Sequence, residues 1–220
     1  MRGLEKSDVC RGAWNGCDVN TVFLLSPASC AGRRAQILLR NEAAFPLADR
    51  LRTTGVPLGE AFSFLSGLYF RGKLAYATAF GRAPEGVDAG LVITTNRGLL
   101  PADTIITHAD LCAFGAVPID ASNPVYRTPL EASARALRKT VPDARVVLLG
   151  SIASDKYVTI LLEVFGDGLL FPSEFVGRGD MGRGGLLLRK VDEGAELEYV
   201  PVAGAIRRGS RPPKLEPRQR

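Results

Sequence analysis

The sequence predicts a single-domain α/β protein, a three-layer sandwich with a mostly parallel central sheet. Short apolar runs alternate along the chain with segments whose apolar residues recur at helical spacing. This alternation is typical of parallel strands joined by crossover helices. It is clearest in residues 145–189, where a strand, a helix and a second strand precede a segment rich in glycine and arginine. We expect the rest of the chain to assemble around that unit.

The composition fits one globular domain. The chain has 220 residues, of which 46% are hydrophobic and 23% are charged. A chain of this size buries roughly 70% of the surface that its unfolded form exposes, so its core needs no metal or disulfide. We expect residues 1–19 to be an irregular lead-in with Trp14 packed on the body, residues 20–203 to form the α/β domain, and residues 204–220 to be a basic, disordered tail.

The N-terminal half is expected to hold two strands. Residues 21–25 form a continuous apolar run that predicts a buried strand, and residues 91–94 predict the second. Residues 35–51 show a helical pattern between them. Residues 58–80 carry aromatic side chains at helical spacing, with Gly67 in the middle. Since glycine weakens a helix interior, we expect two short helices that meet near Gly67.

The C-terminal half continues the alternation. We expect, in order, a helical turn from His108, a short edge strand at 116–119, an amphipathic helix at 129–140, a strand at 146–149, a helix at 154–165, a strand at 169–171 and a last strand at 197–202. Pro201 favours an edge position for that last strand because proline cannot donate to a neighbouring strand.

The net charge of +5 lies in the tail. Residues 203–220 hold six basic residues and one acidic residue, and the rest of the chain holds 22 of each sign. Such a tail can contact phosphates non-specifically. A solubilising role is the alternative interpretation.

The cysteine pattern predicts no metal site and no cofactor. None of Cys10, Cys17, Cys30 and Cys112 forms a C-x-x-C pair, and His108 is the sole histidine. No window approaches the roughly 20 apolar residues of a membrane span, and the N-terminus lacks the apolar core of a secretory signal. We therefore expect a cytoplasmic protein without a membrane partner. The sequence does not indicate the oligomeric state.

The predicted ligand site lies where the parallel strands end. The carboxyl ends of parallel strands meet at one edge of a sheet, and ligands bind there in open α/β folds. Loops rich in hydroxyl, glycine and arginine residues follow the strands at 21, 91, 146 and 169. The expected ligand-binding residues are Ser26, Asn96, Arg97, Ser151, Tyr157, Gly177, Arg178, Gly179, Arg183 and Gly184.

The segment G-R-G-D-M-G-R-G-G, residues 177–185, allows two interpretations. Its glycines let backbone N–H groups approach an anion, while Arg178 and Arg183 supply bidentate contacts to phosphate or carboxylate. Alternatively, the glycines permit a tight corner between a strand and a helix, with Asp180 paired to either arginine. The segment matches neither nucleotide-binding fingerprint, G-x-G-x-x-G or the Walker lysine loop.

Four residues are candidates for catalysis. Cys30 follows the first strand beside two arginines, which would lower the pKa of a thiol at a helix start. A small, partly buried wall residue is the alternative for Cys30. Glu174 and Asp180 could act as acid and base in one loop, and Asp155 either caps a helix or faces the cleft.

The order of several short segments resembles a known family. The segments are L-L-S-P-A-S-C, L-Y-F-R-G-K-L-A-Y-A, L-V-I-T-T-N-R-G-L-L-P, V-V-L-L-G-S and F-P-S-E-F-V-G-R-G-D-M-G-R-G-G. In this order they resemble a group of small, uncharacterised bacterial α/β proteins, which is similar in turn to the uracil-DNA-glycosylase-like domain of archaeosine synthase. The resemblance implies a glycosylase-like α/β sandwich with a site for a nucleobase or nucleotide.

Two functional hypotheses follow. The first is a protein that binds a nucleotide, nucleobase or nucleic acid at the strand ends and acts in nucleic-acid modification, with Tyr157 or Tyr69 stacked on the base. The second is a non-catalytic protein whose basic tail docks on a macromolecular partner. Whether the chain is an enzyme stays open at this stage.

Overall fold

The computed structural model describes residues 19–215, and a six-stranded sheet lies at their centre. In spatial order the strands are β4 (Leu99–Pro101), β3 (Gly90–Ile93), β1 (Thr21–Leu25), β6 (Arg145–Leu149), β7 (Leu169–Pro172) and β8 (Tyr199–Pro201). β1, β3, β6 and β7 run parallel to one another, while β4 and β8 are antiparallel edge strands. The predicted mostly parallel sheet is confirmed.

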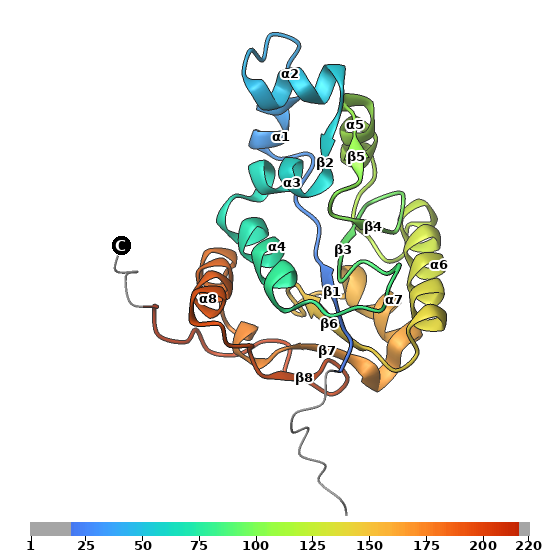
Figure 1. Ribbon diagram of the computed structural model, residues 1–220, viewed down its shortest axis with the longest axis vertical. Helices are drawn as coiled ribbons and strands as arrows, with labels where there is room; N and C mark the ends of the chain where they lie inside the picture. The colour runs from blue at the N-terminus through green and yellow to red at the C-terminus, as the bar shows by residue number, and fades with distance from the viewer. Residues whose placement is uncertain (1–18, 216–220) are drawn as a thin grey trace, which may run out of the picture.

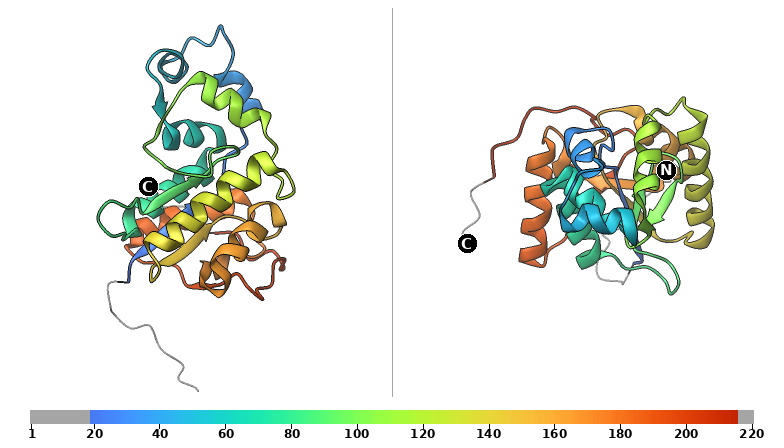
Figure 2. Two further views of the ribbon diagram at one scale, coloured as in Figure 1. Left: turned by 90° about the vertical axis from the view of Figure 1, so that its right-hand side faces the viewer. Right: turned by 90° about the horizontal axis from the view of Figure 1, so that it is seen from above.

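Helices cover both faces of this sheet. The helices of the described residues are α1 (Arg33–Leu38), α2 (Pro46–Thr53), α3 (Leu58–Ser66), α4 (Leu68–Phe80), α5 (His108–Ala116), α6 (Pro124–Thr140), α7 (Asp155–Phe165) and α8 (Asp180–Glu193). α4 packs on α8 at one face, and α6 packs on α7 at the other (Figure 1). Seen from above, α8 and α6 stand on opposite sides of the sheet (Figure 2). The described residues thus form one three-layer α/β domain.

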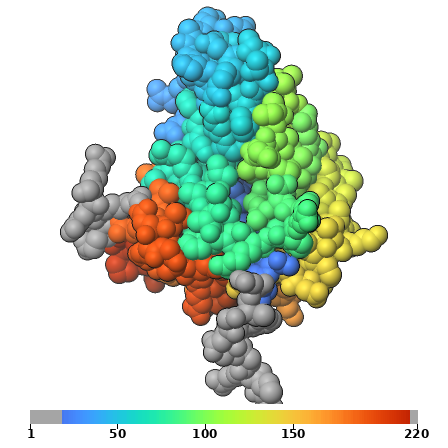
Figure 3. Space-filling view, in the orientation of Figure 1, coloured from blue at the N-terminus to red at the C-terminus, as the bar shows by residue number. Residues whose placement is uncertain are grey.

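A smaller group of elements projects beyond the end of β1. It holds α1, α2, α5 and a two-stranded antiparallel sheet of β2 (Val56–Pro57) and β5 (Ile105–Ile106). In the space-filling view this group forms the narrow upper part of the molecule (Figure 3). It stands on the side to which the parallel strands point, so it walls the edge where a ligand site is expected.

Several local predictions are confirmed. All five residues of β1 are buried, as its continuous apolar run predicts. The helices α3 and α4 meet at Gly67, whose φ of 60° belongs to the left-handed region that glycine enters without strain. β8 lies at an edge of the sheet and ends at Pro201.

The edge strand predicted at 116–119 is wrong. α5 ends at Ala116, and the edge beside β3 is occupied by β4, which belongs to a segment interpreted as a loop. A tight turn at Gly98, with φ of 68°, brings Leu99 back against β3, and Thr94 donates its N–H to the Gly98 carbonyl. This hairpin leaves no free edge for residues 116–119.

One helix begins earlier than predicted, and another lies where a loop was expected. α6 starts at Pro124 rather than Pro129, because the Asn123 side chain accepts the Val125 N–H and Pro124 takes the first helical position. α8 starts at Asp180, so much of the glycine-rich segment is helix rather than loop. The glycines inside α8 have a packing role that outweighs their low helix propensity, as described below.

The described part of the tail runs along the surface without helix or strand. Arg207 pairs with Asp155, and the Arg178 guanidinium donates to the Pro213 carbonyl. The predicted disorder of residues 204–220 stays a prediction. Cys10, Trp14 and Cys17 lie outside the described residues. Within the described range, no helix has the length and apolar character needed to span a membrane.

Candidate functional site

The largest of the described pockets opens at the carboxyl ends of the parallel strands. It has a volume of about 900 Å³ and is lined in part by residues that follow β1, β3 and β6. The chain passes from β1 outward to β3 and later returns to the other side of β1 as β6. The point where strand order reverses therefore lies between β1 and β6, which is where open α/β sheets bind ligands. Ser26 and Ser151 line the cavity at that point.

Lys73 lies beneath this edge of the sheet. It projects from α4, is 1% exposed, and donates from Nζ to the Ser26 carbonyl and to Ser26 Oγ, the latter at 2.9 Å. Its ammonium also lies 4.5 Å from the ring centre of Tyr69 and 4.7 Å from that of Phe70. Burial lowers the pKa of Lys73 from 10.5 to about 7, since a desolvated ammonium loses its hydration.

Arg183 supplies a second buried cation on α8. It is 8% exposed; its Nε donates to the Phe175 carbonyl, and its guanidinium lies over the Phe175 ring. Asp180, one turn earlier, is 3.4 Å from Arg183 Nη1, and its side chain is 70% exposed. Both charges shift the pKa of Lys73: Asp180 raises it and Arg183 lowers it. The electrostatics of the floor are therefore set jointly by α4 and α8.

The Tyr69 hydroxyl lacks a partner. Tyr69 lines the cavity and is 5% exposed, and burial raises the pKa of its hydroxyl above the usual range. Arg183 counteracts part of that rise, through its charge and through a side-chain interaction with the hydroxyl, while its N–H groups donate to the Phe175 carbonyl and to Asp180. Within residues 19–215 the Tyr69 hydroxyl has no hydrogen-bond partner. A buried polar group without a partner costs stability and marks a place where a ligand atom could bind.

Tyr157 closes the cavity from the side of α7. Its hydroxyl donates to the Ser151 carbonyl at 2.9 Å, and burial raises its pKa while a contact with Ser26 lowers it. Gly150 makes this approach possible, because a Cβ there would lie 2.9 Å from both Ser26 Cβ and the Tyr157 hydroxyl. The glycine that ends β6 thus lets Ser26 and Tyr157 come together.

The structure brings three of the ten predicted ligand-binding residues and two of the four catalytic candidates to the wall of the cavity. Ser26, Ser151 and Tyr157 line the cavity together with two of the four catalytic candidates, Cys30 and Asp180. Burial raises the pKa of the Cys30 thiol to about 12, and its Sγ contacts the Ala28 carbonyl. The thiol is therefore protonated at neutral pH, which suits the alternative interpretation of Cys30 as a wall residue.

Other predicted residues have partners elsewhere. Arg97 pairs with Asp110 and lies 5.7 Å from the ring centre of Phe114. The side-chain amide oxygen of the neighbouring Asn96 is buried and has no hydrogen-bond partner among the described residues. Asp155 pairs with Arg207, and Glu174 is exposed in the short helical turn that follows β7.

The glycine and arginine segment mainly serves packing. Gly177 has φ of 72°, and a Cβ there would lie 2.1 Å from the Ser210 carbonyl of the tail. Arg178 contacts the Glu174 and Pro213 carbonyls, and Gly179 precedes α8 as its N-cap. Gly184 allows α8 to touch α4, since its Cβ would lie 2.8 Å from the Leu68 carbonyl. Of this segment, Asp180 lines the cavity, and Arg183 is buried close to the cavity residue Tyr69.

Sequence reasoning missed Lys73. Its signal was its position: it lies four residues after Tyr69 and three before Tyr76, in the centre of a buried helical stripe. A lysine at such a position is almost never buried unless it serves a polar partner.

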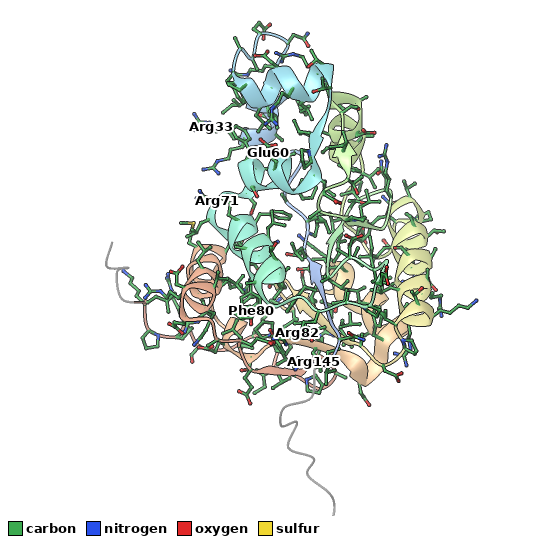
Figure 4. All side chains as sticks on the ribbon, viewed as in Figure 1. Arg33, Glu60, Arg71, Phe80, Arg82 and Arg145 are labelled. Atoms are coloured by element: carbon green, nitrogen blue, oxygen red, sulfur yellow. The ribbon has the colours of Figure 1, made fainter. Side chains whose placement is uncertain are left out.

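Four other basic residues do not line the cavity. Arg33 and Arg71 project outward, whereas Arg82 and Arg145 lie at the opposite end of the sheet, where β1 begins (Figure 4). Both of these contact Glu196. Among the described residues, no group of three or more His, Cys, Asp and Glu side chains could hold a metal ion.

The fold and this cavity define the chain as an α/β protein with a cavity at the carboxyl ends of its parallel strands. Comparison of the chain with protein-family models, curated proteins and solved structures finds no match.

Proposed function

We propose that the cavity binds a nucleotide, a nucleobase-bearing fragment or the end of a nucleic acid. The observation that carries the proposal is the buried Tyr69 hydroxyl on the wall of the cavity, with no partner among the described residues and with two buried cations, Lys73 and Arg183, close to the Tyr69 side chain. A ligand with both an acceptor and a negative charge would satisfy all three groups at once.

Charge at the floor favours an anion. Lys73 and Arg183 are both buried, while Asp180, the carboxylate that contacts Arg183, is largely exposed and therefore screened by water. Lys156 adds a further cation at the rim. An anionic group that enters the cavity meets an excess of positive charge in a partly desolvated place, where such attraction is strongest.

The walls suit a nucleoside. Ser26, Ser66, Thr95 and Ser151 line the cavity together with Tyr69 and Tyr157. Hydroxyls exchange hydrogen bonds with sugar and base edges, and a stacked base gains about 1–3 kcal/mol on an aromatic ring. The volume of about 900 Å³ also falls within the usual range for small-molecule sites.

The resemblance to a glycosylase-like domain supports the same class of ligand. It adds a setting, nucleic-acid modification, in which a base is presented to a strand-end cleft. The proposal includes the cytoplasmic location that we expect from the sequence.

A thermal-shift screen tests the proposal. The purified chain is screened against nucleobases, nucleosides, nucleotides and short single-stranded RNA and DNA, with sulfate as the anion control. A ligand at 100 times its Kd adds about 2.7 kcal/mol, which raises Tm by several degrees at this size. We expect at least one nucleobase-bearing ligand to exceed sulfate. Stabilisation by sulfate alone, or by nothing, would contradict the proposal.

A further inference from the structure

Ser26 and Lys73 form a pair that ligand binding alone does not require. Ser26 follows β1 directly, so its Oγ is held at the end of the central strand and lines the cavity. Lys73 Nζ approaches that Oγ to 2.9 Å from the protein side. A serine hydroxyl between a cavity and a buried amine has the arrangement of a nucleophile with its base.

The surroundings of Lys73 favour the neutral amine. Its hydrogen-bond acceptors are the carbonyl and hydroxyl of Ser26, neither of which is charged. Among the groups that shift its pKa, α8 contributes one negative charge, Asp180, and one positive charge, Arg183, which oppose each other; α4 contributes the rings of Tyr69 and Phe70. Burial dominates and brings the pKa to about 7. Near neutral pH a large fraction of Lys73 therefore carries a lone pair.

We propose that Ser26 is a nucleophile and Lys73 its general base in the hydrolysis of an ester through an acyl-serine. This goes beyond ligand binding, and it depends on the cavity but not on the identity of the ligand as a nucleotide.

The reaction consumes one ester and one water, and Lys73 carries the proton in each of its two steps. Ser26 Oγ forms a bond to the acyl carbon while its proton passes to Lys73 Nζ. The ester C–O bond breaks, and the departing alkoxide takes that proton from Lys73 and leaves as the alcohol. Water then attacks the acyl carbon and gives a proton to Lys73. Ser26 Oγ departs with that proton, which releases the carboxylic acid and restores the pair.

Two further groups support the step. The Tyr69 hydroxyl, which lacks a partner among the described residues, is a free donor for the negative oxygen that forms at the acyl carbon. Tyr157 flanks Ser26 and is itself fixed by the Ser151 carbonyl, which keeps the serine side chain in place.

A fluorophosphonate probe tests the pair on the full chain. The probe reacts with an activated serine hydroxyl and adds a fixed mass that peptide mapping locates. We expect one adduct, on Ser26, and none on Ser29 or Ser151, which line the same cavity but accept no hydrogen bond from Lys73. The labelling rate should rise between pH 6 and 8 with a midpoint near 7, as Lys73 loses its proton, and then level off.

Variants separate a base from a structural lysine. Ser26→Ala should abolish labelling, and Lys73→Met should slow it by about 100-fold or more, the usual effect of removing a general base. Lys139→Met, an exposed lysine on α6, is the matched control and should label like the wild type. Near-UV circular dichroism checks the fold of each variant.

Labelling of the wild-type protein tests the proposal even if Lys73→Met fails to fold. Absence of an adduct on Ser26, or a labelling rate without an inflection between pH 6 and 8, would overturn the proposal. Labelling of folded Lys73→Met at the wild-type rate would overturn it as well.

Discussion

Lys73 carries either a positive charge or a lone pair at the floor of the cavity, depending on pH. The rings of Tyr69 and Phe70 favour the cation, whereas burial favours the neutral amine, and burial has the larger effect on the pKa. This balance lets one side chain attract an anionic ligand below pH 7 and act as a base above it.

The same pKa predicts how stability depends on pH. Between about pH 7 and 10 the unfolded chain keeps a proton on Lys73 that the folded chain has lost. Stability should therefore rise with pH in this window, by up to about 1.4 kcal/mol per pH unit, and the contribution should be constant below it. Lys73→Met removes the effect. We expect urea unfolding at pH 7 and pH 9 to show the wild type gaining stability relative to this variant, and a parallel response of both proteins would refute the assignment.

At the residue scale, half of the site followed from the pattern of the sequence. Ser26, Ser151 and Tyr157 follow predicted strands, and the ends of parallel strands share one edge whatever the details of packing. Lys73 and Tyr69 come from a helix in between, so their convergence on Ser26 depends on how α4 docks. Arg97 and Arg178 were expected in the site because arginine suits anions, but nearby Asp110 and the tail carbonyl of Pro213 engage them.

At the element scale, the contact between α4 and α8 positions the floor of the cavity. A Cβ at Gly72 would lie 2.7 Å from the Gly184 carbonyl, and a Cβ at Gly184 would lie 2.8 Å from Tyr69 Cα. The two backbones therefore touch, which carries Arg183 to the edge of Tyr69. Glycine appears in α8 because side chains would hold the helices apart.

A pair of glycine substitutions tests this contact. Gly184→Ala should destabilise the fold by about 1–3 kcal/mol, since the new methyl group overlaps the backbone of α4. Gly182→Ala is the matched control in the same helix, where a Cβ would meet only Arg178 Cβ at 3.8 Å. This control should be neutral or stabilise by up to about 1 kcal/mol, through helix propensity. Equal effects in urea unfolding would show that the helices do not meet at Gly184.

These elements also show where sequence patterns suffice. The four parallel strands could be predicted because each is a continuous apolar run, which is the pattern typical of a strand buried on both faces. The start of α8 could not, because its glycines have low helix propensity and their partner, Gly72, lies over 100 positions away. The hairpin between β3 and β4 was also missed. Its turn depends on Gly98, and a glycine at this position is equally typical of a loop.

At the scale of the whole molecule, the excess positive charge lies in the C-terminal tail and not in the residues that line the cavity. The +5 charge lies in residues 203–220, while the described tail contacts Gly177 and Arg178, in the segment before α8, and Asp155, at the start of α7. The tail residues Arg208, Arg211 and Lys214 remain exposed. Non-specific attraction to polyanions and binding in the cavity should therefore be independent properties.

Deletion of residues 207–220 separates the two. The truncated chain should elute from heparin at lower salt, because it loses the six basic residues that hold the excess charge. Its stability should fall by about 1 kcal/mol or less, since the lost ion pair is exposed. Affinity for a nucleotide should stay within twofold of the full chain. Loss of that affinity would favour the alternative hypothesis, in which the tail is the binding element.

The measurement that tests the central claim most directly is calorimetric titration of the best ligand from the screen into Tyr69→Phe and Tyr126→Phe. Both tyrosine hydroxyls are buried without a partner among the described residues, but only Tyr69 lines the cavity. We expect Tyr69→Phe to weaken binding by about 1 kcal/mol, roughly fivefold, without loss of stability, and Tyr126→Phe to bind like the wild type. Equal affinity in the wild type and Tyr69→Phe would contradict the assignment of this cavity as the ligand site.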